Sequence, residues 1–322
     1  MQKIPEKEYH MKYIAIDFIC QMTSPAVFSP YKGSMLRGAL GTSLRCSVCM
    51  THKRECGGCM LQATCMFPRL FGACAAPAGG GTTPLLPPPF CIEPPHDRKT
   101  TYDEGESFSF CLKLFSHATE YLPYFVHAFM LAGRHGLGKR TEQGQGCFRL
   151  VDIRQGESSL YDATSETLHS PQMVELPLPS LQPGGETALL ACDLLTPLRF
   201  KADNRLAARL DFPTLMRLII RRIKSLCALD GLSFQLPQEE FSRLFALAAD
   251  VVIEEDSLRW EDWSRYSGRQ QTVMQLGGLV GRIVYRGAVA AFAEYLAFAS
   301  LVHIGKQSSF GLGALDFHGM PA

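Results

Sequence analysis

The sequence lacks the features that mark secreted and membrane proteins. Its first eight residues contain no apolar segment of a secretory signal, and no uninterrupted apolar run is long enough to span a bilayer. Nucleophile-elbow, Walker, dinucleotide-binding and HExxH motifs are also missing. Paired carboxylates occur only within acidic runs such as 254–256. These absences exclude several common enzyme classes and predict a cytoplasmic protein with no membrane partner.

Charge of one sign is not in excess, because 32 Lys and Arg nearly balance 31 Asp and Glu. A net charge of +1 weighs against a general polyanion binder, but the charges are segregated. Residues 32–54 carry five Lys or Arg and no acid, and residues 199–224 carry eight against two acids. This distribution fits one basic face on a neutral protein, with ordinary solvated helix faces as the alternative.

The length of 322 residues, 46% of them hydrophobic, suits two domains with packed cores. Alternating and helical periodicities interleave along the chain, which predicts an α+β protein. We expect strands at 13–19, 107–115, 149–153, 189–200, 251–263 and 279–285. We expect helices from Ser34 to Leu44 and at 120–131, 212–229, 241–249 and 289–301. One side of the 212–229 helix presents a basic stripe of Arg217, Arg221 and Lys224.

Two glycine-rich segments follow helices and precede strands. His135-Gly-Leu-Gly-Lys-Arg…Gly144-Gln-Gly146 parallels His303-Ile-Gly-Lys…Gly311-Leu-Gly313, which predicts an internal repeat of roughly 150 residues. Glycine lets such a loop approach a phosphate chain closely, and its N–H, hydroxyl and lysine groups are suitable donors. Chance recurrence in a chain with 28 glycines is the alternative. Each half would form a split βαβ, ferredoxin-like (RRM-like) unit, a scaffold of single-strand RNA-binding modules.

The boundaries follow from this repeat and from composition. We expect a first domain at 1–156, a polar, proline-rich linker at 157–186 and a second domain at 187–322. Within the first domain, a cysteine-rich knuckle would occupy 46–74 and a flexible Pro/Gly loop 75–95.

Five cysteines lie close together in the knuckle, as Cys46-x2-Cys49-x6-Cys56-x2-Cys59-x5-Cys65. Twelve cysteines in a chain with no signal segment favour reduced thiols and metal ligands over disulfides. Four thiolates suit a structural Zn²⁺ site, formed by Cys46, Cys49, Cys56 and Cys59 or by Cys49, Cys56, Cys59 and Cys65. We prefer the second quartet; an iron–sulfur cluster and plain buried cysteines are the alternatives.

His52, Lys53 and Arg54 lie inside the knuckle, where an imidazole beside two cations could transfer protons at neutral pH. A surface cluster that merely attracts RNA explains the same residues. Tyr31, Lys32 and Arg37, around the first helix, form a competing group. His135 and His303 are expected to cap helix carbonyls.

Several of these segments resemble CRISPR-associated, precursor-crRNA-processing endoribonucleases of the RAMP superfamily. The similar segments are 303–313, 32–41 with the following cysteines, 195–200 and 281–287, so the resemblance spans nearly the whole chain. It implies tandem ferredoxin-like domains that bind a CRISPR repeat and cleave it by metal-independent attack of a ribose 2′-OH. It also implies a catalytic histidine in or after the first helix, which by position is His52 with Tyr31 and Lys53 as helpers.

The resemblance also implies the binding partners. These are CRISPR repeat RNA within the precursor and other CRISPR effector subunits, with the chain as a monomer or homodimer and no cofactor for catalysis. The RNA-binding residues expected from the loops and basic segments are Lys32, Arg37, Arg134, Lys139, Arg140, Arg199, Gly305, Lys306, Gln307, Ser308, Ser309, Phe310, Gly311 and Gly313. Two other readings stay open: a non-catalytic guide-RNA-binding subunit and a zinc-dependent nucleic-acid-binding protein.

Overall fold

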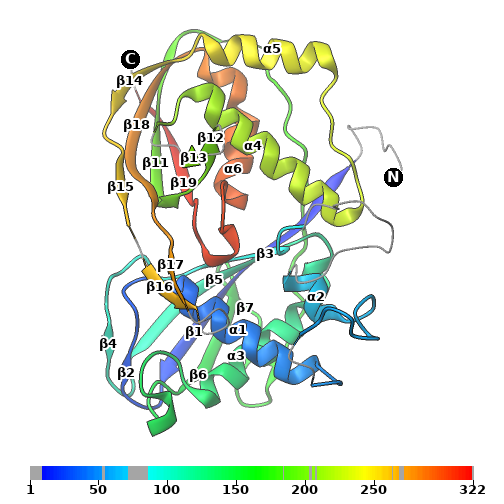
Figure 1. Ribbon diagram of the computed structural model, residues 1–322, viewed down its shortest axis with the longest axis vertical. Helices are drawn as coiled ribbons and strands as arrows, with labels where there is room; N and C mark the ends of the chain where they lie inside the picture. Colours follow the sequence, from blue (N-terminus) through cyan, green and yellow to red (C-terminus); the bar gives the residue numbers. More distant parts are fainter. Residues whose placement is uncertain are drawn as a thin grey trace. The chain divides into compact units, whose positions relative to one another are not determined.

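The computed structural model describes residues 9–52, 55–71, 86–183, 185–202, 205–206, 209–262, 264–267 and 272–320. The chain divides into two compact units (Figure 1). The N-terminal unit is Met11–Leu176, and the C-terminal unit is Pro177–Ala322 together with Met1–His10. Residues 157–186, predicted to be a linker, contain short strands between Ser158 and Pro177.

The N-terminal unit consists of a main sheet, helices and several short strand pairs. Its strands are β1 (His10–Met22), β2 (Ala26–Val27), β3 (Phe90–Glu93), β4 (Thr101–Tyr102), β5 (Ser107–Phe115), β6 (Phe148–Gln155), β7 (Ser158–Ser159), β8 (Tyr161–Asp162), β9 (Thr167–Leu168) and β10 (Val174–Pro177). Its α-helices are α1 (Gly33–Val48), α2 (Met66–Phe71) and α3 (Leu122–His135), with 3-10 turns at Ser116–Tyr121 and Thr141–Gln143.

The main sheet of this unit has the order β3-β5-β1-β6, followed by β7, with antiparallel neighbours. Strand β1 buries alternate residues, Ile14, Ile16, Phe18, Cys20 and Met22, so one face of the sheet is apolar. Helices α1 and α3 bring their buried leucine and phenylalanine side chains into the same core. The order of strands and helices is that of a ferredoxin-like unit.

The C-terminal unit repeats this arrangement. Its strands are β11 (Ala188–Leu198), β12 (Lys201–Ala202), β13 (Arg205–Leu206), β14 (Val252–Asp256), β15 (Arg259–Glu261), β16 (Ser264–Ser267), β17 (Thr272–Gln275), β18 (Gly278–Gly287) and β19 (Leu315–Met320). Its α-helices are α4 (Phe212–Cys227), α5 (Gln238–Ala249) and α6 (Ala293–Val302), with 3-10 turns at Ala228–Asp230, Val289–Phe292 and Ser308–Phe310.

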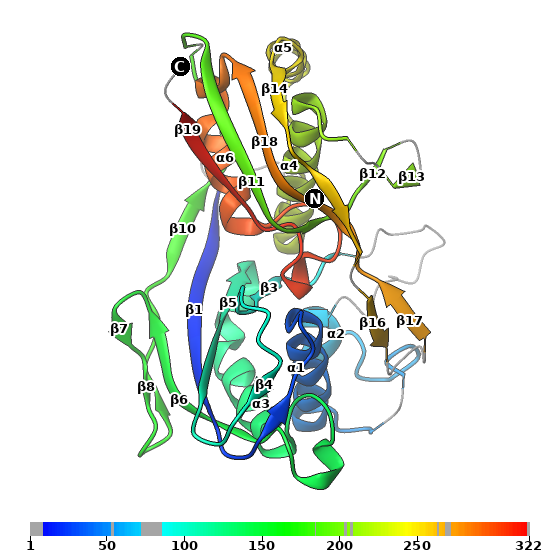
Figure 2. The ribbon, with the colours of Figure 1, turned by 90° about the vertical axis from the view of Figure 1, so that its left-hand side faces the viewer.

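The C-terminal sheet has the order β14-β18-β11-β19, the same topology as β3-β5-β1-β6. Helices α4 and α6 lie on one face of it (Figure 2). The buried side of α4 includes Leu215, Ile219, Ile223 and Leu226, as its 3.6-residue periodicity predicts. The expectation of two ferredoxin-like domains is therefore confirmed.

No α-helix in the described part of the chain has the length and apolar character that a bilayer crossing would require.

Candidate nucleic-acid interface

The glycine-rich loop of the C-terminal unit, His303–Gly313, is fastened to the end of β11 by main-chain hydrogen bonds. Ile304 N–H donates to the Gly313 carbonyl (3.1 Å), which closes the loop. Gly313 N–H donates to Pro197 (3.2 Å), and Lys306 N–H donates to Arg199 (2.8 Å). These bonds hold the loop in one conformation, so its exposed groups are presented without a large ordering cost.

The corresponding loop of the N-terminal unit, Gly136–Cys147, has the same bonding pattern. It is fastened to the segment after β1, and the equivalent donor and acceptor pairs are Leu137 to Gly146 (2.8 Å), Gly146 to Pro25 (2.9 Å) and Lys139 to Val27 (3.0 Å). In both loops a residue with left-handed backbone precedes the 3-10 turn, Arg140 in one and Gln307 in the other. The repeat predicted from sequence is thus a repeat of hydrogen bonds, and chance recurrence of glycine does not explain it.

Glycine is required where each loop closes. An added Cβ would lie 2.0 Å from the Leu137 carbonyl oxygen at Gly146, and 1.8 Å from the Ile304 carbonyl oxygen at Gly313. Both residues also have positive φ, +80° and +73°. The second Gly-X-Gly glycine is therefore explained by backbone packing.

The two loops expose different groups. In the N-terminal unit the side chains of Arg134, Lys139 and Arg140 are all exposed. In the C-terminal unit Lys306 is exposed and Gly305 and Gln307 are half-buried. Ser308, Ser309, Phe310, Gly311 and Gly313 are buried, so this turn packs inward, and their contact with RNA stays a prediction.

Two further cations of the C-terminal unit have structural partners. Arg199, half-buried, donates from its guanidinium to the Gly277 carbonyl (2.9 Å). Arg222 is buried and donates twice to the carbonyl of Val302 at the end of α6 (3.0 and 2.9 Å). The next residue, His303, is buried with Nδ1 3.3 Å from the Leu312 carbonyl oxygen. These contacts set the position at which the glycine-rich loop begins.

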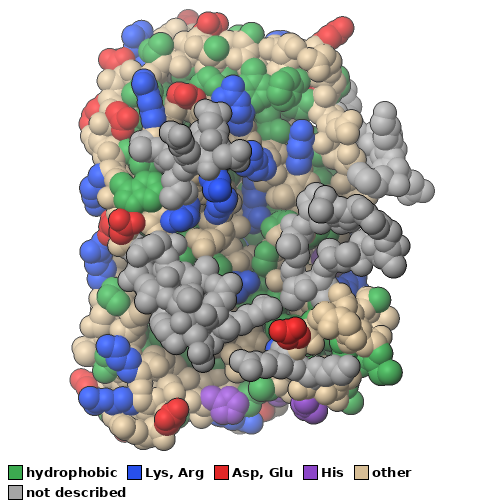
Figure 3. Space-filling view, viewed as in Figure 1, with side chains coloured by type: hydrophobic (Ala, Val, Ile, Leu, Met, Phe, Trp, Pro, Cys, Tyr) green, Lys and Arg blue, Asp and Glu red, His purple; other side chains and the backbone are tan. Residues whose placement is uncertain are grey.

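The basic stripe of α4 lies on the surface, as predicted. Arg217, Arg221 and Lys224 are exposed. Figure 3 shows Lys and Arg side chains gathered on the face of the C-terminal unit that α4 crosses in Figure 1. Such a concentration of cations on a neutral protein favours contact with a polyanion.

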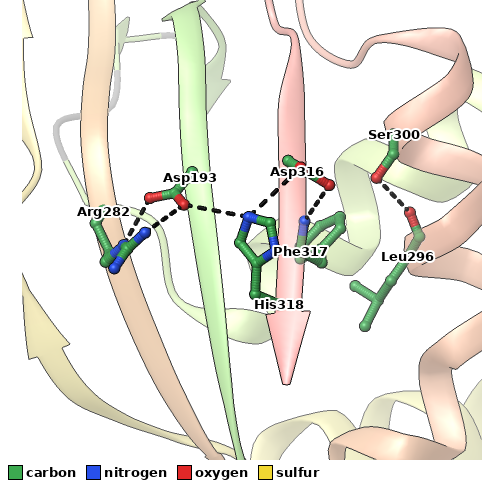
Figure 4. A network of polar contacts seen from close by, with 7 residues as sticks. All are labelled: Asp193, Arg282, Leu296, Ser300, Asp316, Phe317 and His318. Carbon is green, nitrogen blue, oxygen red and sulfur yellow. Dashed lines mark hydrogen bonds and ion pairs between the residues drawn. The ribbon is translucent and has the colours of Figure 1, made fainter. Parts of the chain in front are cut away.

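The open face of the C-terminal sheet is not a base-stacking platform. Arg282, Asp193 and Asp316 lie on the neighbouring strands β18, β11 and β19, with His318 at the end of the same row (Figure 4). Arg282 makes a bidentate ion pair with Asp193, and both N–O distances are 2.7 Å. The His318 imidazole lies 3.5 Å from the Asp193 carboxylate and 3.4 Å from the Asp316 carboxylate. The guanidinium lowers the pKa of Asp193 despite its partial burial. Fixed carboxylates here repel phosphate, so the exposed cations of the loops and of α4 offer the better surface for a polyanion.

The start of α1 brings together one group of predicted site residues. Lys32 is buried, with its ammonium 2.7 Å from the Asp97 carboxylate and 3.2 Å from the Asp97 carbonyl oxygen. Although partial burial acts in the opposite direction, this ammonium lowers the pKa of Asp97. Lys32 therefore holds the β3–β4 connection in place, and its contact with RNA stays a prediction.

Tyr31, just before this helix, and Arg37, within it, also lie against neighbouring side chains. Burial, reinforced by Cys91 and Glu93, raises the pKa of Tyr31 well above its ordinary value, so Tyr31 is a neutral hydrogen-bond donor at physiological pH. The guanidinium of Arg37 lies over the Phe71 ring (5.1 Å) and near Phe90 (6.0 Å), where it contributes packing.

Two of the predicted catalytic residues, Tyr31 and His52, lie at opposite ends of α1. Tyr31 precedes α1 and His52 follows it, and a helix of 16 residues separates them. At 1.5 Å per residue this is about 24 Å, too far for joint action on one phosphate. His52 is exposed and has positive φ (51°), while Lys53 lies outside the described residues. Tyr31 and His52 both lie close to α1 in the sequence, but the 16 residues of the helix keep them apart in space.

A histidine missed in the sequence analysis lies at the other end of α1. His96 is exposed in the β3–β4 connection, directly before Asp97. Adjacent Cα atoms are about 3.8 Å apart, so the Lys32–Asp97 ion pair holds His96 near the start of α1. Exposed Arg98 and Lys99 follow it. His96-Asp-Arg-Lys repeats the composition of His52-Lys-Arg, which is the signal that could have identified it.

Four of the knuckle cysteines line one pocket: Cys49, Cys56, Cys59 and Cys65. Cys46 is exposed on α1 and is not among the lining residues. The pocket lies against the last turn of α1 and the start of α2, at the opposite end of α1 from Lys32.

Two ferredoxin-like units in tandem, each closed by a glycine-rich loop between a helix and the last sheet strand, define a protein of the RAMP fold. Residues 193–315 match the family model of the CRISPR-associated endoribonuclease Cas6, and residues 11–173 match the model AF_1859_N, described as an N-terminal domain. The C-terminal part of the chain, residues 193–315, therefore contains a domain of the Cas6 family. The resemblance seen in the sequence is confirmed. A search of curated protein sequences finds no match.

Solved structures show the same fold. A Cas6-RT-Cas1–Cas2 complex contains a similar chain (12% identity, TM-score 0.57), with 98% of this chain and 30% of that chain covered. The chain thus spans less than a third of that relative. A Cas6 product complex (14% identity, TM-score 0.54) is covered over 95% of this chain and 100% of that one. Thermus thermophilus Cas6 is 12% identical with a TM-score of 0.52, and the match covers 96% of this chain and 99% of that chain. At sequence identities this low, the structural similarity shows a common fold and nothing more specific.

Proposed function

We propose that this protein binds the repeat of precursor crRNA and cleaves it, leaving guide RNAs with a 5′ handle. The observation that supports this most directly is the fastened loop at 303–313 within the Cas6-matching region, together with its hydrogen-bonded counterpart at 136–147. Lys306 in one loop and Lys139 and Arg140 in the other would contact phosphates, and the α4 stripe would extend that contact.

The proposed reaction needs no metal. A base removes the proton of a ribose 2′-OH, and the 2′-oxygen attacks the adjacent phosphorus. The bond from phosphorus to the 5′-oxygen breaks, and that oxygen takes up a proton. The products are a 2′,3′-cyclic phosphate and a 5′-hydroxyl. Acid–base catalysis of this kind contributes roughly 10²–10⁴-fold to the rate.

We place the acid–base chemistry at the start of α1. There the exposed His96 imidazole precedes the exposed Arg98 and Lys99 in the β3–β4 connection, and the neutral Tyr31 hydroxyl lies near Cys91 and Glu93 of β3. The cations would stabilise charge on the pentacoordinate phosphorus, and the imidazole would exchange protons at neutral pH. His52 is the alternative from sequence, and its distance from Tyr31 argues against the two acting together.

Incubation of the protein with its own repeat RNA in EDTA tests the proposal. One cut near the base of the stem is expected, with a cyclic phosphate detected by mass spectrometry. His96→Ala should slow cleavage by roughly 10²–10⁴-fold with binding retained, whereas the matched variant His52→Ala should cleave at a near-normal rate. The reverse result would return the chemistry to the knuckle.

A specific observation favours a second candidate. The histidine and tyrosine predicted from sequence are not assembled, so the chain could bind guide RNA as a non-catalytic subunit of a CRISPR effector complex. Tight repeat binding without any cut, in EDTA and in Mg²⁺ alike, would establish that function and reject the nuclease.

A further inference from the structure

The knuckle between α1 and α2 brings four thiols to one place. Cys49 follows the last residue of α1, and Cys65 precedes the first residue of α2. Between them the backbone makes tight turns, with Cys59 N–H donating to the Cys56 carbonyl (3.1 Å) and Cys65 N–H donating to Leu61 (2.8 Å). These turns direct all four cysteines into the same pocket.

Two of the sulfurs lie against a single hydroxyl. The Thr51 Oγ1 is 4.0 Å from Cys49 Sγ and 3.5 Å from Cys59 Sγ. The two sulfurs are therefore no farther apart than the sum of these distances. Sulfurs bound to one Zn²⁺ lie closer, because each Zn–S bond is about 2.3 Å. Binding one ion would therefore require these cysteine side chains to move together.

The segment between α1 and α2 buries little of its large apolar side chains. Met50 and Met60 are 78% and 86% exposed. Within the described residues, no group of three or more ligating side chains is already arranged to hold a metal ion. Small segments without an apolar core are commonly stabilised by a structural metal, whose binding then completes the local fold.

We propose that Cys49, Cys56, Cys59 and Cys65 bind one Zn²⁺ through four thiolates and thereby fix the connection from α1 to α2. Each ligand loses its proton on binding, and the four sulfurs fill a tetrahedral shell. No position is left for a substrate, so the site is structural. The alternative quartet that includes Cys46 is disfavoured, because Cys46 lies outside the pocket.

Metal analysis of the full-length protein, purified under reducing conditions without a histidine tag, tests this site. One zinc per chain is expected. Cys65→Ser should lose the zinc, while the matched variant Cys46→Ser should keep it. Cobalt exchanged into the site should give the visible ligand-field bands of a tetrahedral thiolate centre, and Cys65→His should retain metal with altered bands.

Several outcomes would overturn the proposal: no bound zinc, iron with inorganic sulfide, or loss of zinc from Cys46→Ser. If Cys65→Ser does not fold, the Cys65→His spectrum and zinc titration of the chelator-treated parent still decide the question. The zinc content does not depend on RNA cleavage, so failure of the proposed function would leave this result unaffected.

Discussion

Replacing Gly146 by alanine provides a direct test of the loop architecture, because Gly144 in the same loop is a matched control. Both glycines have similar positive φ, +74° at Gly144 and +80° at Gly146. An alanine forced into this region costs about 1–2 kcal/mol, partly offset by the lower entropy of the unfolded variant. Nothing lies within 4 Å of a Cβ at Gly144, so Gly144→Ala should carry that cost alone.

Gly146→Ala should cost considerably more. Its Cβ would meet the Leu137 carbonyl oxygen at 2.0 Å, and main-chain atoms cannot move aside as a flexible side chain does. The required shift breaks the Leu137–Gly146 hydrogen bond (2.8 Å) and disturbs the Gly146–Pro25 bond (2.9 Å). Each such bond contributes about 0.5–1.5 kcal/mol, so the total should approach ~3 kcal/mol.

Differential scanning calorimetry and urea denaturation measure this difference. For a unit of this size, 1 kcal/mol corresponds to a Tm shift of about 2–4 °C. Gly144→Ala should thus lower the Tm of the N-terminal unit by roughly 2–4 °C and Gly146→Ala by roughly 6–12 °C. Equal shifts for the two variants would refute the close approach of the two main-chain segments.

Three further results are expected. Lys306→Ala should weaken repeat binding and reduce the slope of log K against log salt by about 0.7–0.9, and unchanged affinity in a salt titration would remove this loop from the interface. Asp193→Asn should lower the Tm at neutral pH. Because the pKa of Asp193 is depressed below its ordinary 3.8, the Tm difference between the variant and the parent should shrink as the pH falls below that value. A Tm difference that persists in acid would contradict the ion pair with Arg282. Asp97→Ala should strip the buried Lys32 ammonium of its carboxylate and slow cleavage with little change in binding, whereas an unaltered rate would separate the β3–β4 connection from the chemistry.

Much of the fold could be predicted because periodicity and burial agree in the long elements. The helix expected at 212–229 is α4, Phe212–Cys227, and the strand expected at 189–200 is β11, Ala188–Leu198. Both contribute an unbroken apolar face, so local pattern and tertiary packing select the same conformation. The repeated loop could also be recognised from the sequence, because main-chain contacts require glycine at corresponding positions of both copies.

Strand β3, Phe90–Glu93, was missed. Three prolines precede it, and the composition of 75–95 indicates an extended loop. The strand forms because β5 offers an edge to which Phe90 and Ile92 can pair while both side chains are buried. A non-local partner of this kind leaves no signal in a short window. Residues 75–85 of the predicted loop and 72–74 of the predicted knuckle lie outside the described part of the chain.

The site was harder to predict than the fold, because sequence distance misrepresents spatial distance in both directions. Tyr31 and His52 are 21 positions apart and separated by a whole helix, whereas Lys32 and Asp97 are 65 positions apart and form an ion pair. Phe310 was expected on the surface from its polar, glycine-rich setting, yet the 3-10 turn directs it inward. Only the three-dimensional arrangement distinguishes these cases.

The two units share a fold but differ where their first helix begins, and this difference argues for a division of labour. Helix α4 starts at Asp211, whose carboxylate accepts a hydrogen bond from Thr214 N–H (2.7 Å). That anion occupies the helix terminus where a phosphate would otherwise be favoured. Helix α1 starts instead at Lys32, whose ammonium is paired with the Asp97 carboxylate of the β3–β4 connection (2.7 Å). In the proposed function His96, next to Asp97, acts on the RNA at this end of the N-terminal unit, so changes at His96 should affect the cleavage rate while changes at Lys306 affect binding.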